Sequence, residues 1–291
     1  MEKQLIRFDW AIKHILRQKE NFSILEGFLS ELLKEDITII EILESESNKE
    51  TETNRLNRVD ILAKDKKESY IVFEIQVTKE LDYLSRILFG VSKIISERLN
   101  RSAKYEEVKK VYSVNIVYFD LGYGVDYVYR GTTNFFGLHK NDKLELSEQQ
   151  KKLYEYNSIE EIFPECYILK VDSFDDNTKD NLDEWIYFLK NEKVKDTFSA
   201  RGLKEAEEKL NVLKMKEEER RKYDRYLDEL RYEASMVDSS YGIGKIEGIA
   251  EGEKRKAYEI AIRLLENSVS PELVSASTGL SQEEIRKIVI T

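Results

Sequence analysis

The feature that most constrains this chain is a pair of short apolar runs, each interrupted by one carboxylate. The runs are residues 59–63 and 71–77, and a charged turn, residues 64–69, joins them. Two short β-rich runs separated by a polar turn predict a β-hairpin. Asp60 lies in the first run and Glu74 in the second. Because a carboxylate among β-branched neighbours is costly to bury without compensation, we expect something to balance these two charges.

Side-chain alternation predicts how the two carboxylates are presented. Glu74 and Gln76 share one face of the second strand, and Arg58 and Asp60 share one face of the first. Two carboxylates on paired strands suit Mg²⁺, which takes one or two of them and keeps several waters. Such an ion can activate water and polarise a phosphate oxygen. The alternative is that both carboxylates are solvated or salt-bridged on an open sheet face, and spacing alone leaves that alternative open.

The order of elements carries a family resemblance. Asp60, the Glu-Ile-Gln triplet at 74–76, and a helix directly afterwards resemble the core of PD-(D/E)XK nucleases. More narrowly, they resemble the Rpn family of recombination-promoting nucleases and transposases, in which Arg86, with Phe89 three residues later, also finds a match. The resemblance implies an α/β fold, with a mixed central sheet flanked by helices in α-β-β-β-α-β order and an all-α C-terminal extension.

The same resemblance implies a metal-dependent DNA endonuclease that hydrolyses phosphodiester bonds in DNA recombination or in mobile elements, with Mg²⁺ or Mn²⁺ as cofactor. It assigns Asp60, Glu74 and Gln76 to catalysis, Asp60, Glu74 and the Ile75 carbonyl to the metal, and Arg86 and Arg58 to the substrate. The chain departs from the broad nuclease pattern at Gln76, where the usual residue is Lys. A Lys carries charge, whereas a neutral amide can only hydrogen-bond the attacking water. The competing interpretation is therefore a catalytically weak or inactive nucleic-acid-binding or assembly protein that acts through its helical tail.

Composition narrows the class of protein. In 291 residues, 41% are hydrophobic, with 17 Tyr and 12 Phe, which is typical of a folded chain. One Cys excludes an intramolecular disulfide and a multi-Cys zinc site, and two His count against a His-rich metal site. A net charge of −10 counts against DNA affinity from global charge, although a local basic groove beside the metal stays compatible with it. We see no signal-peptide pattern and no run of membrane-spanning length, and so expect a cytoplasmic protein without membrane contact.

The flanking sequence supplies the other expected elements. We expect helices within 6–34, 80–100 and 181–189, and strands at 37–43 and 110–119 and within 126–138 and 165–171. Ser23, with Glu26 three residues later, reads as a capping box. The polar loop 44–57 contains Glu44 and Glu46, either of which could add a carboxylate, but we assign neither. The expected apolar face of helix 80–100 consists of Leu81, Leu84, Leu88, Val91, Ile95 and Leu99.

Composition shifts near residue 201, so we expect a nuclease-like domain over 1–200 and a helical extension over 201–291. Residues 203–235 predict a long charged helix, and the glycines at 242, 244, 248 and 252 predict a flexible joint or a close helix contact. Short helices with cap signals at Ser270-Pro271, Gly279 and Ser281 resemble a helix-turn-helix. DNA is the expected partner, and the C-terminal helices leave room for a homo-oligomer.

Overall fold

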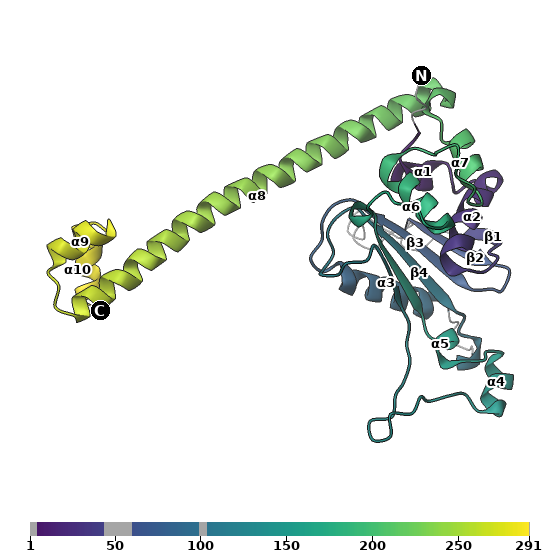
Figure 1. The fold of residues 1–291 in the computed structure, drawn as a ribbon, viewed down its shortest axis with the longest axis horizontal. Helices are drawn as coiled ribbons and strands as arrows, with labels where there is room; N and C mark the ends of the chain where they lie inside the picture. The colour runs from purple at the N-terminus through teal and green to yellow at the C-terminus, as the bar shows by residue number, and fades with distance from the viewer. Residues whose placement is uncertain (1–4, 44–59, 99–103, 291) are drawn as a thin grey trace. The chain divides into compact units, whose positions relative to one another are not determined.

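A six-stranded mixed sheet organises the first part of the chain, with the strand order β1-β2-β3-β4-β6-β5 (Figure 1). The computed structural model describes residues 5–43, 60–98 and 104–290. The strands are β1 (Ile39–Leu43), β2 (Ile61–Asp65), β3 (Tyr70–Gln76), β4 (Val111–Val117), β5 (Val128–Gly131) and β6 (Glu165–Lys170). β1, β2 and β3 form an antiparallel meander, β3, β4 and β6 run parallel, and β5 closes the edge antiparallel to β6. This mixed sheet and its order of elements confirm the predicted fold class.

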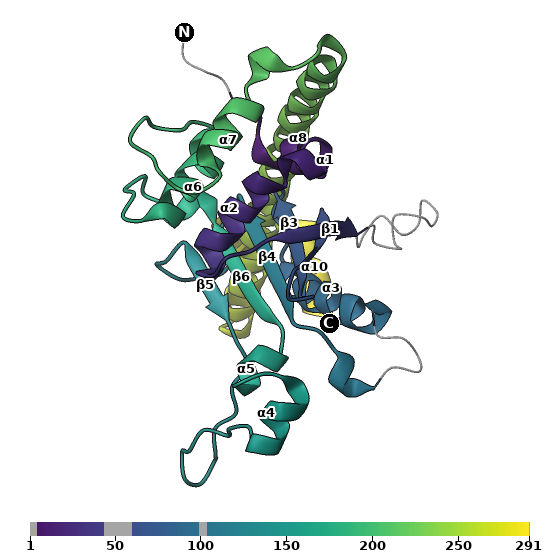
Figure 2. The ribbon, with the colours of Figure 1, turned by 90° about the vertical axis from the view of Figure 1, so that its right-hand side faces the viewer.

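Helices cover both faces of the sheet (Figures 1 and 2). The helices of this part of the chain are α1 (Phe8–His14), α2 (Phe22–Leu33), α3 (Tyr83–Arg98), α4 (Glu148–Tyr154), α5 (Ile159–Ile162), α6 (Asn181–Asn191) and α7 (Leu203–Lys209). Of these, α4 and α5 lie beyond one end of the strands and cover neither face. On one face, the ring of Phe73 from β3 lies 6.3 Å from Phe8 and 5.5 Å from Phe28, and Phe28 lies 5.5 Å from Trp185. α1, α2 and α6 therefore share one aromatic core with the sheet.

α3 packs on the opposite face. Its Val91 and Ile94 form a buried cluster with Leu62 of β2 and Val72 of β3. Because side chains alternate along a strand, Glu74 follows Val72 onto this same face and Phe73 takes the other. The alternation expected for β3 is thus the one observed, and Glu74 lies on the face that the first turns of α3 approach.

Two helix details differ from the sequence expectations. α3 buries Tyr83, Ile87, Val91 and Ile94. Of the apolar face that we expected, Val91 is buried, but Leu84 and Leu88 of α3 and Leu81 before it are exposed, and Leu99 lies outside the described residues. α2 begins at Phe22 with Asn21 at the N-cap, so Ser23 does not cap it. Glu26, expected to complete the capping box, instead accepts a hydrogen bond from the backbone N–H of Ile39 at 2.8 Å. In both cases tertiary contacts override a local pattern.

The chain divides into two compact units, Met1–Tyr223 and Asp224–Thr291. Residue 200, where we expected a boundary, falls inside the first unit, because Leu203 and Ala206 of α7 are buried and Leu5 bridges to Asn211. The N–H of Arg7 also donates to the Tyr223 hydroxyl at 3.0 Å.

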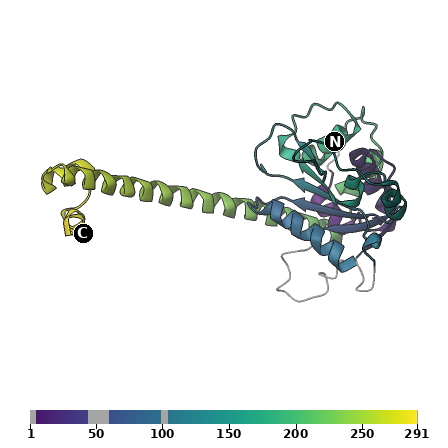
Figure 3. The same ribbon diagram turned by 90° about the horizontal axis from the view of Figure 1, so that it is seen from below.

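One helix, α8 (Glu217–Glu266), is continuous through the glycines that predicted a joint (Figure 3). A Cβ atom added at Gly242, Gly244, Gly248 or Gly252 would meet nothing within 4 Å, so no other described part of the chain packs closely against these glycines. α9 (Pro271–Thr278) and α10 (Gln282–Ile290) follow, with Ser270 and Gly279 as caps as predicted. They enclose a small core with the end of α8. No helix in the described ranges is long and apolar enough to cross a membrane.

Candidate active site

Asp60 lies directly before β2 and is held against the backbone of β3. Its Oδ2 accepts a hydrogen bond from the N–H of Ile75 at 2.8 Å. The N–H and C=O of one residue in a strand point to the same side, so the Ile75 carbonyl also faces the edge where Asp60 lies. Burial raises the pKa of Asp60, although the charge of Lys13 and the Ile75 hydrogen bond oppose that shift. The carboxylate is therefore close to β3 but incompletely compensated.

Glu74 is the second carboxylate and is 7% exposed. Burial raises its pKa to about 7, and the Arg86 charge only partly opposes this, while the charges of Asp60 and Glu80 add to it. Arg86 brings a guanidinium nitrogen within 2.5 Å of Glu74 Oε1. Their geometry is that of an ion pair without a well-directed hydrogen bond, since this buried Oε1 has no hydrogen-bond partner in the part of the chain that the structure describes. Glu74 thus keeps an under-satisfied oxygen beside other acidic groups.

Two exposed cations from the N-terminal segment approach Asp60. The Nζ of Lys13, on α1, lies 3.4 Å from Asp60 Oδ1. The guanidinium of Arg17 donates to the Asp60 carbonyl. Because both side chains are exposed, they offer positive charge to an anion arriving at this edge of the sheet.

Gln76 and Glu80 complete the arrangement at the end of β3. Gln76 Nε2 donates to Glu80 Oε1 at 2.8 Å and to the Thr78 carbonyl at 3.0 Å. Arg86 donates to the two oxygens of Glu80 at 2.8 and 2.9 Å. One guanidinium is therefore shared by Glu74 and Glu80, and a continuous polar network runs from Glu74 to Gln76.

The structure brings most of the sequence-predicted site residues to one edge of the sheet: Asp60, Glu74, Ile75, Gln76 and Arg86. Arg58, Glu44 and Glu46 lie outside the described residues. From the sequence we assigned no role to Glu80, Lys13, Arg17 or Tyr83. The hydroxyl of Tyr83 is buried and has no hydrogen-bond partner within residues 5–43, 60–98 and 104–290. Lys13 lies on α1 and Arg17 follows that helix, whereas Glu80 lies in an irregular segment between β3 and α3 that no periodicity describes.

The available donors fit a hard divalent cation. Two carboxylates and a backbone carbonyl are oxygen ligands, which suit Mg²⁺ and Mn²⁺. Within the described ranges, no group of three or more His, Cys, Asp and Glu side chains could hold a metal by itself. That finding is compatible with Mg²⁺, which keeps several waters and needs few protein ligands. The under-satisfied oxygen of Glu74 is the structural observation in favour of this fit.

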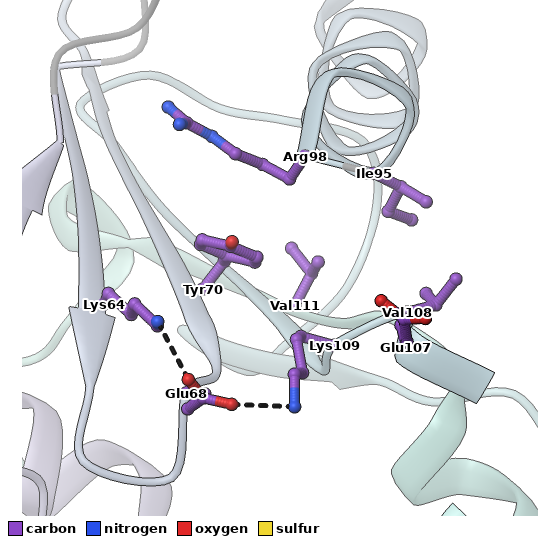
Figure 4. A pocket seen from close by; sticks show the side chains of 9 residues that line it. All are labelled: Lys64, Glu68, Tyr70, Ile95, Arg98, Glu107, Val108, Lys109 and Val111. Atoms are coloured by element: carbon purple, nitrogen blue, oxygen red, sulfur yellow. Dashed lines mark hydrogen bonds and ion pairs between the residues drawn. The ribbon is translucent and has the colours of Figure 1, made fainter. Parts of the chain in front are cut away.

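A polar pocket of about 340 Å³ lies near the turn between β2 and β3, away from Asp60 and Glu74 (Figure 4). Glu68 sits between Lys64 at 3.1 Å and Lys109 at 2.8 Å. Hydrogen bonds from these lysines lower the pKa of Glu68 to about 2. This carboxylate is matched by its partners, whereas Arg86 compensates Glu74 only in part.

Comparison with known proteins supplies the family. No curated protein and no solved structure matches the chain. The family model described as "PD-(D/E)XK nuclease family transposase" matches residues 6–240, which include all of the site residues described above. The match covers most of the chain and runs from α1 into α8. The chain therefore belongs to the PD-(D/E)XK nuclease family transposases.

Proposed function

We propose that this chain is a divalent-metal-dependent DNA endonuclease that acts in recombination or in mobile-element biology within the cytoplasm. The observation that carries the proposal is the buried, under-satisfied Glu74 carboxylate at the same strand edge as Asp60. Family membership supports a nuclease, and DNA is the substrate that it implies. The proposal adds the metal, the endonucleolytic reaction and the individual residue roles.

Asp60, Glu74 and the Ile75 carbonyl would hold Mg²⁺ or Mn²⁺. A bound cation would polarise a phosphate oxygen and provide a nucleophilic water. The Gln76 amide would orient a water molecule by hydrogen bonding, since it cannot carry the charge of a Lys. Arg86 remains a candidate phosphate contact, as does Arg58, which lies outside the described residues.

Lys13 and Arg17 join the candidate phosphate contacts. Both are exposed and both contact Asp60, through its carboxylate and its carbonyl respectively. Arg86 is already shared by two carboxylates, so the N-terminal cations are freer to bind DNA. A local pair of this kind gives a chain of net charge −10 a place for the DNA backbone.

Plasmid nicking with Mg²⁺ or Mn²⁺ tests the proposal. We expect wild type to nick supercoiled DNA, chelation with EDTA to stop nicking, and Asp60→Ala and Glu74→Ala each to lower the rate by about 10²-fold or more. Glu41→Ala, which removes an exposed carboxylate on β1, is the matched control and is expected to keep full activity. Equal nicking by all four proteins would remove the nuclease assignment from this site.

A second function has one observation in its favour, the exposed apolar stripe of α8. Tyr232, Met236, Ile243 and Ile246 follow heptad spacing, and each is about half exposed or more. Such a stripe is self-complementary, so we propose a second copy of this chain as its partner. Assembly through α8 is compatible with the nuclease, and would be the main role of a chain in which Gln76 supports little catalysis.

Light scattering tests the assembly. We expect wild type at twice the chain mass of 34.3 kDa, and the Ile243→Lys, Ile246→Lys double variant at the single-chain mass. Tyr241→Lys places the same charge at an exposed aromatic outside the stripe and is expected to leave the dimer intact. A monomeric wild type at micromolar concentration would contradict the assembly. If wild type and the variants of the nicking assay bind DNA but none of them nicks it, assembly is favoured over the nuclease as the function of this chain.

A further inference from the structure

The side chain of Glu80 accepts three hydrogen bonds within the site, although neither the sequence motif nor the family match assigns it a role. Its Oε1 accepts from Gln76 at 2.8 Å and from Arg86 at 2.8 Å, and its Oε2 accepts from Arg86 at 2.9 Å. The side chain is 30% exposed, so it is neither buried in the core nor free in solvent. It lies between the end of β3 and the start of α3.

The first consequence concerns the Gln76 amide. The two ends of an amide are hard to tell apart by shape, and its orientation follows from its partners. An ionised carboxylate only accepts hydrogen bonds, so the nitrogen of Gln76 must face Glu80. The Thr78 carbonyl, at 3.0 Å from the same nitrogen, is a second acceptor that fixes the same orientation. The amide oxygen is then left as an acceptor for a water molecule or as an oxygen ligand for a cation.

The second consequence concerns Arg86. One of its terminal nitrogens is held by Glu80, while the other lies 2.5 Å from Glu74 Oε1. A cation that binds Glu74 competes with this guanidinium for the carboxylate. Because Glu80 already holds Arg86 through two oxygens, the guanidinium keeps an anionic partner when Glu74 turns to another cation. Without Glu80, Glu74 would be the carboxylate left to pair with Arg86.

We propose that Glu80 is a positioning residue of this nuclease site, which orients the Gln76 amide and holds Arg86 so that Glu74 is available to a divalent cation. The inference rests on the proposed function for its catalytic part, but its metal-binding part is measured independently. Residues that orient metal ligands from behind contribute about 10- to 100-fold to metal affinity or activity. Glu80 acts through Gln76 and Arg86, and we assign it no contact with substrate.

The test is a double-mutant cycle on full-length protein, read out by Mn²⁺ titration calorimetry and by plasmid nicking. Glu80→Gln is expected to raise the Kd for Mn²⁺ about tenfold and to lower kcat about tenfold, with KM for DNA changed less than about twofold. In an Arg86→Gln background the same substitution is expected to change the Mn²⁺ Kd much less, because the competing guanidinium is absent. A role limited to local negative charge would give equal effects in both backgrounds and would overturn the proposal.

Asp82→Asn is the matched control, since it removes an exposed negative charge two residues away and keeps a residue suited to a helix start. We expect it to leave the Mn²⁺ Kd and kcat within about twofold of wild type. Thermal unfolding of each variant reports whether folding is intact, and Glu80→Asp, a shorter carboxylate, is expected to restore part of the affinity.

The outcomes separate the two proposals. Wild type that binds Mn²⁺ but nicks no DNA would overturn the nuclease, while the binding cycle would still decide the role of Glu80 toward Arg86. Wild type that binds and nicks, with Glu80→Gln indistinguishable from Asp82→Asn, would overturn the role of Glu80 alone.

Discussion

Two buried carboxylates on the same sheet are treated in opposite ways. Glu74 is 7% exposed and Glu165 is 5% exposed, so the two are equally withdrawn from water. Glu165, at the first residue of β6, is within 2.5 Å of both Arg130 Nε and the Tyr167 hydroxyl, and 3.3 Å from Lys110 Nζ. Among the described residues Glu74 has one cation within ion-pair distance, Arg86, which it shares with Glu80.

The charge states follow from this difference. At Glu165, burial is outweighed by hydrogen bonds from Arg130 and Tyr167 and by the charge of Lys110, so the pKa is lowered. At Glu74, burial dominates and neighbouring carboxylates add to it, so the pKa rises to about 7. A buried carboxylate with a full set of partners fits a structural role, and we propose that the less completely paired Glu74 is kept for a ligand.

Replacing each carboxylate by a neutral amide should reveal the largest difference between Glu74 and Glu165. Glu165→Gln leaves Lys110 buried without its carboxylate, and breaking a buried ion pair in this way costs about 4 kcal/mol. Glu74→Gln removes a charge that burial already disfavours, so metal-free stability should be unchanged or slightly higher. Urea unfolding in EDTA measures both. Comparable losses in the two variants would mean that Glu74 is as structurally satisfied as Glu165.

The pH dependence of stability should separate the two carboxylates next. The folded pKa of Glu74 is about 7 and its unfolded value is 4.5, so between these pH values the folded state holds a proton that the unfolded state has lost. Metal-free stability should therefore fall as pH rises through this window, by about 3 kcal/mol in total at 1.36 kcal/mol per pKa unit. Unfolding of wild type at pH 4.5 to 8 gives the slope.

Glu74→Gln is expected to flatten that slope, whereas the group at Glu165 acts in the opposite direction. Its folded pKa is lowered, so its contribution is present above its unfolded pKa and is lost as pH falls through the folded value. A metal-free profile that Glu74→Gln leaves unchanged would assign the slope to other groups.

A divalent cation should sharpen the contrast further. A ligand that binds only the folded state stabilises it by about 2.7 kcal/mol at a concentration of 100 Kd. We expect Mg²⁺ or Mn²⁺ to raise the unfolding midpoint of wild type, and EDTA to reverse the effect. Glu74→Gln should lose this response, because the negative charge of the carboxylates is what binds the cation. Lys64→Ala, at the pocket of Glu68, is a matched control that should respond like wild type. Stabilisation that survives in Glu74→Gln would place the cation elsewhere.

Local periodicity explains how far the sequence predicts this contrast. Side chains alternate between the two faces of a strand, so the sequence of β3 alone places Glu74 and Gln76 on the same face. Helix periodicity was ambiguous, because α3 carries apolar residues at helical spacing on two faces. Packing against Val72 and Leu62 selected the face with Val91 and Ile94. That choice depends on residues distant in sequence, so spacing within the helix cannot make it.

The missed site residues have the same physical explanation. Lys13 meets Asp60 only because α1 packs near the sheet edge, a contact between distant parts of the chain. Glu80 meets Gln76 in an irregular segment whose backbone no repeating pattern describes. Hydrogen-bond partners of buried groups follow from the assembled fold, so the sequence indicated the two carboxylates and Arg86, but not Lys13 and Glu80, whose charges also act on those carboxylates.

The smallest effect separates two buried tyrosines, one beside each carboxylate. The Tyr167 hydroxyl donates to Glu165 at 2.5 Å. The Tyr83 hydroxyl is buried and has no hydrogen-bond partner among the described residues. Burial raises the pKa of Tyr83, and the charge of Glu74 adds a smaller rise. Tyr167→Phe removes a hydrogen bond to a charged group and should cost about 1.5 kcal/mol. Tyr83→Phe removes an unpaired polar atom and should cost nothing or stabilise the metal-free protein. Urea unfolding of the two variants in EDTA measures the difference. If Tyr83→Phe lowers the free energy of unfolding as much as Tyr167→Phe does, the Tyr83 hydroxyl has a hydrogen-bond partner. The polar groups around Glu74 would then be more fully hydrogen-bonded than we infer.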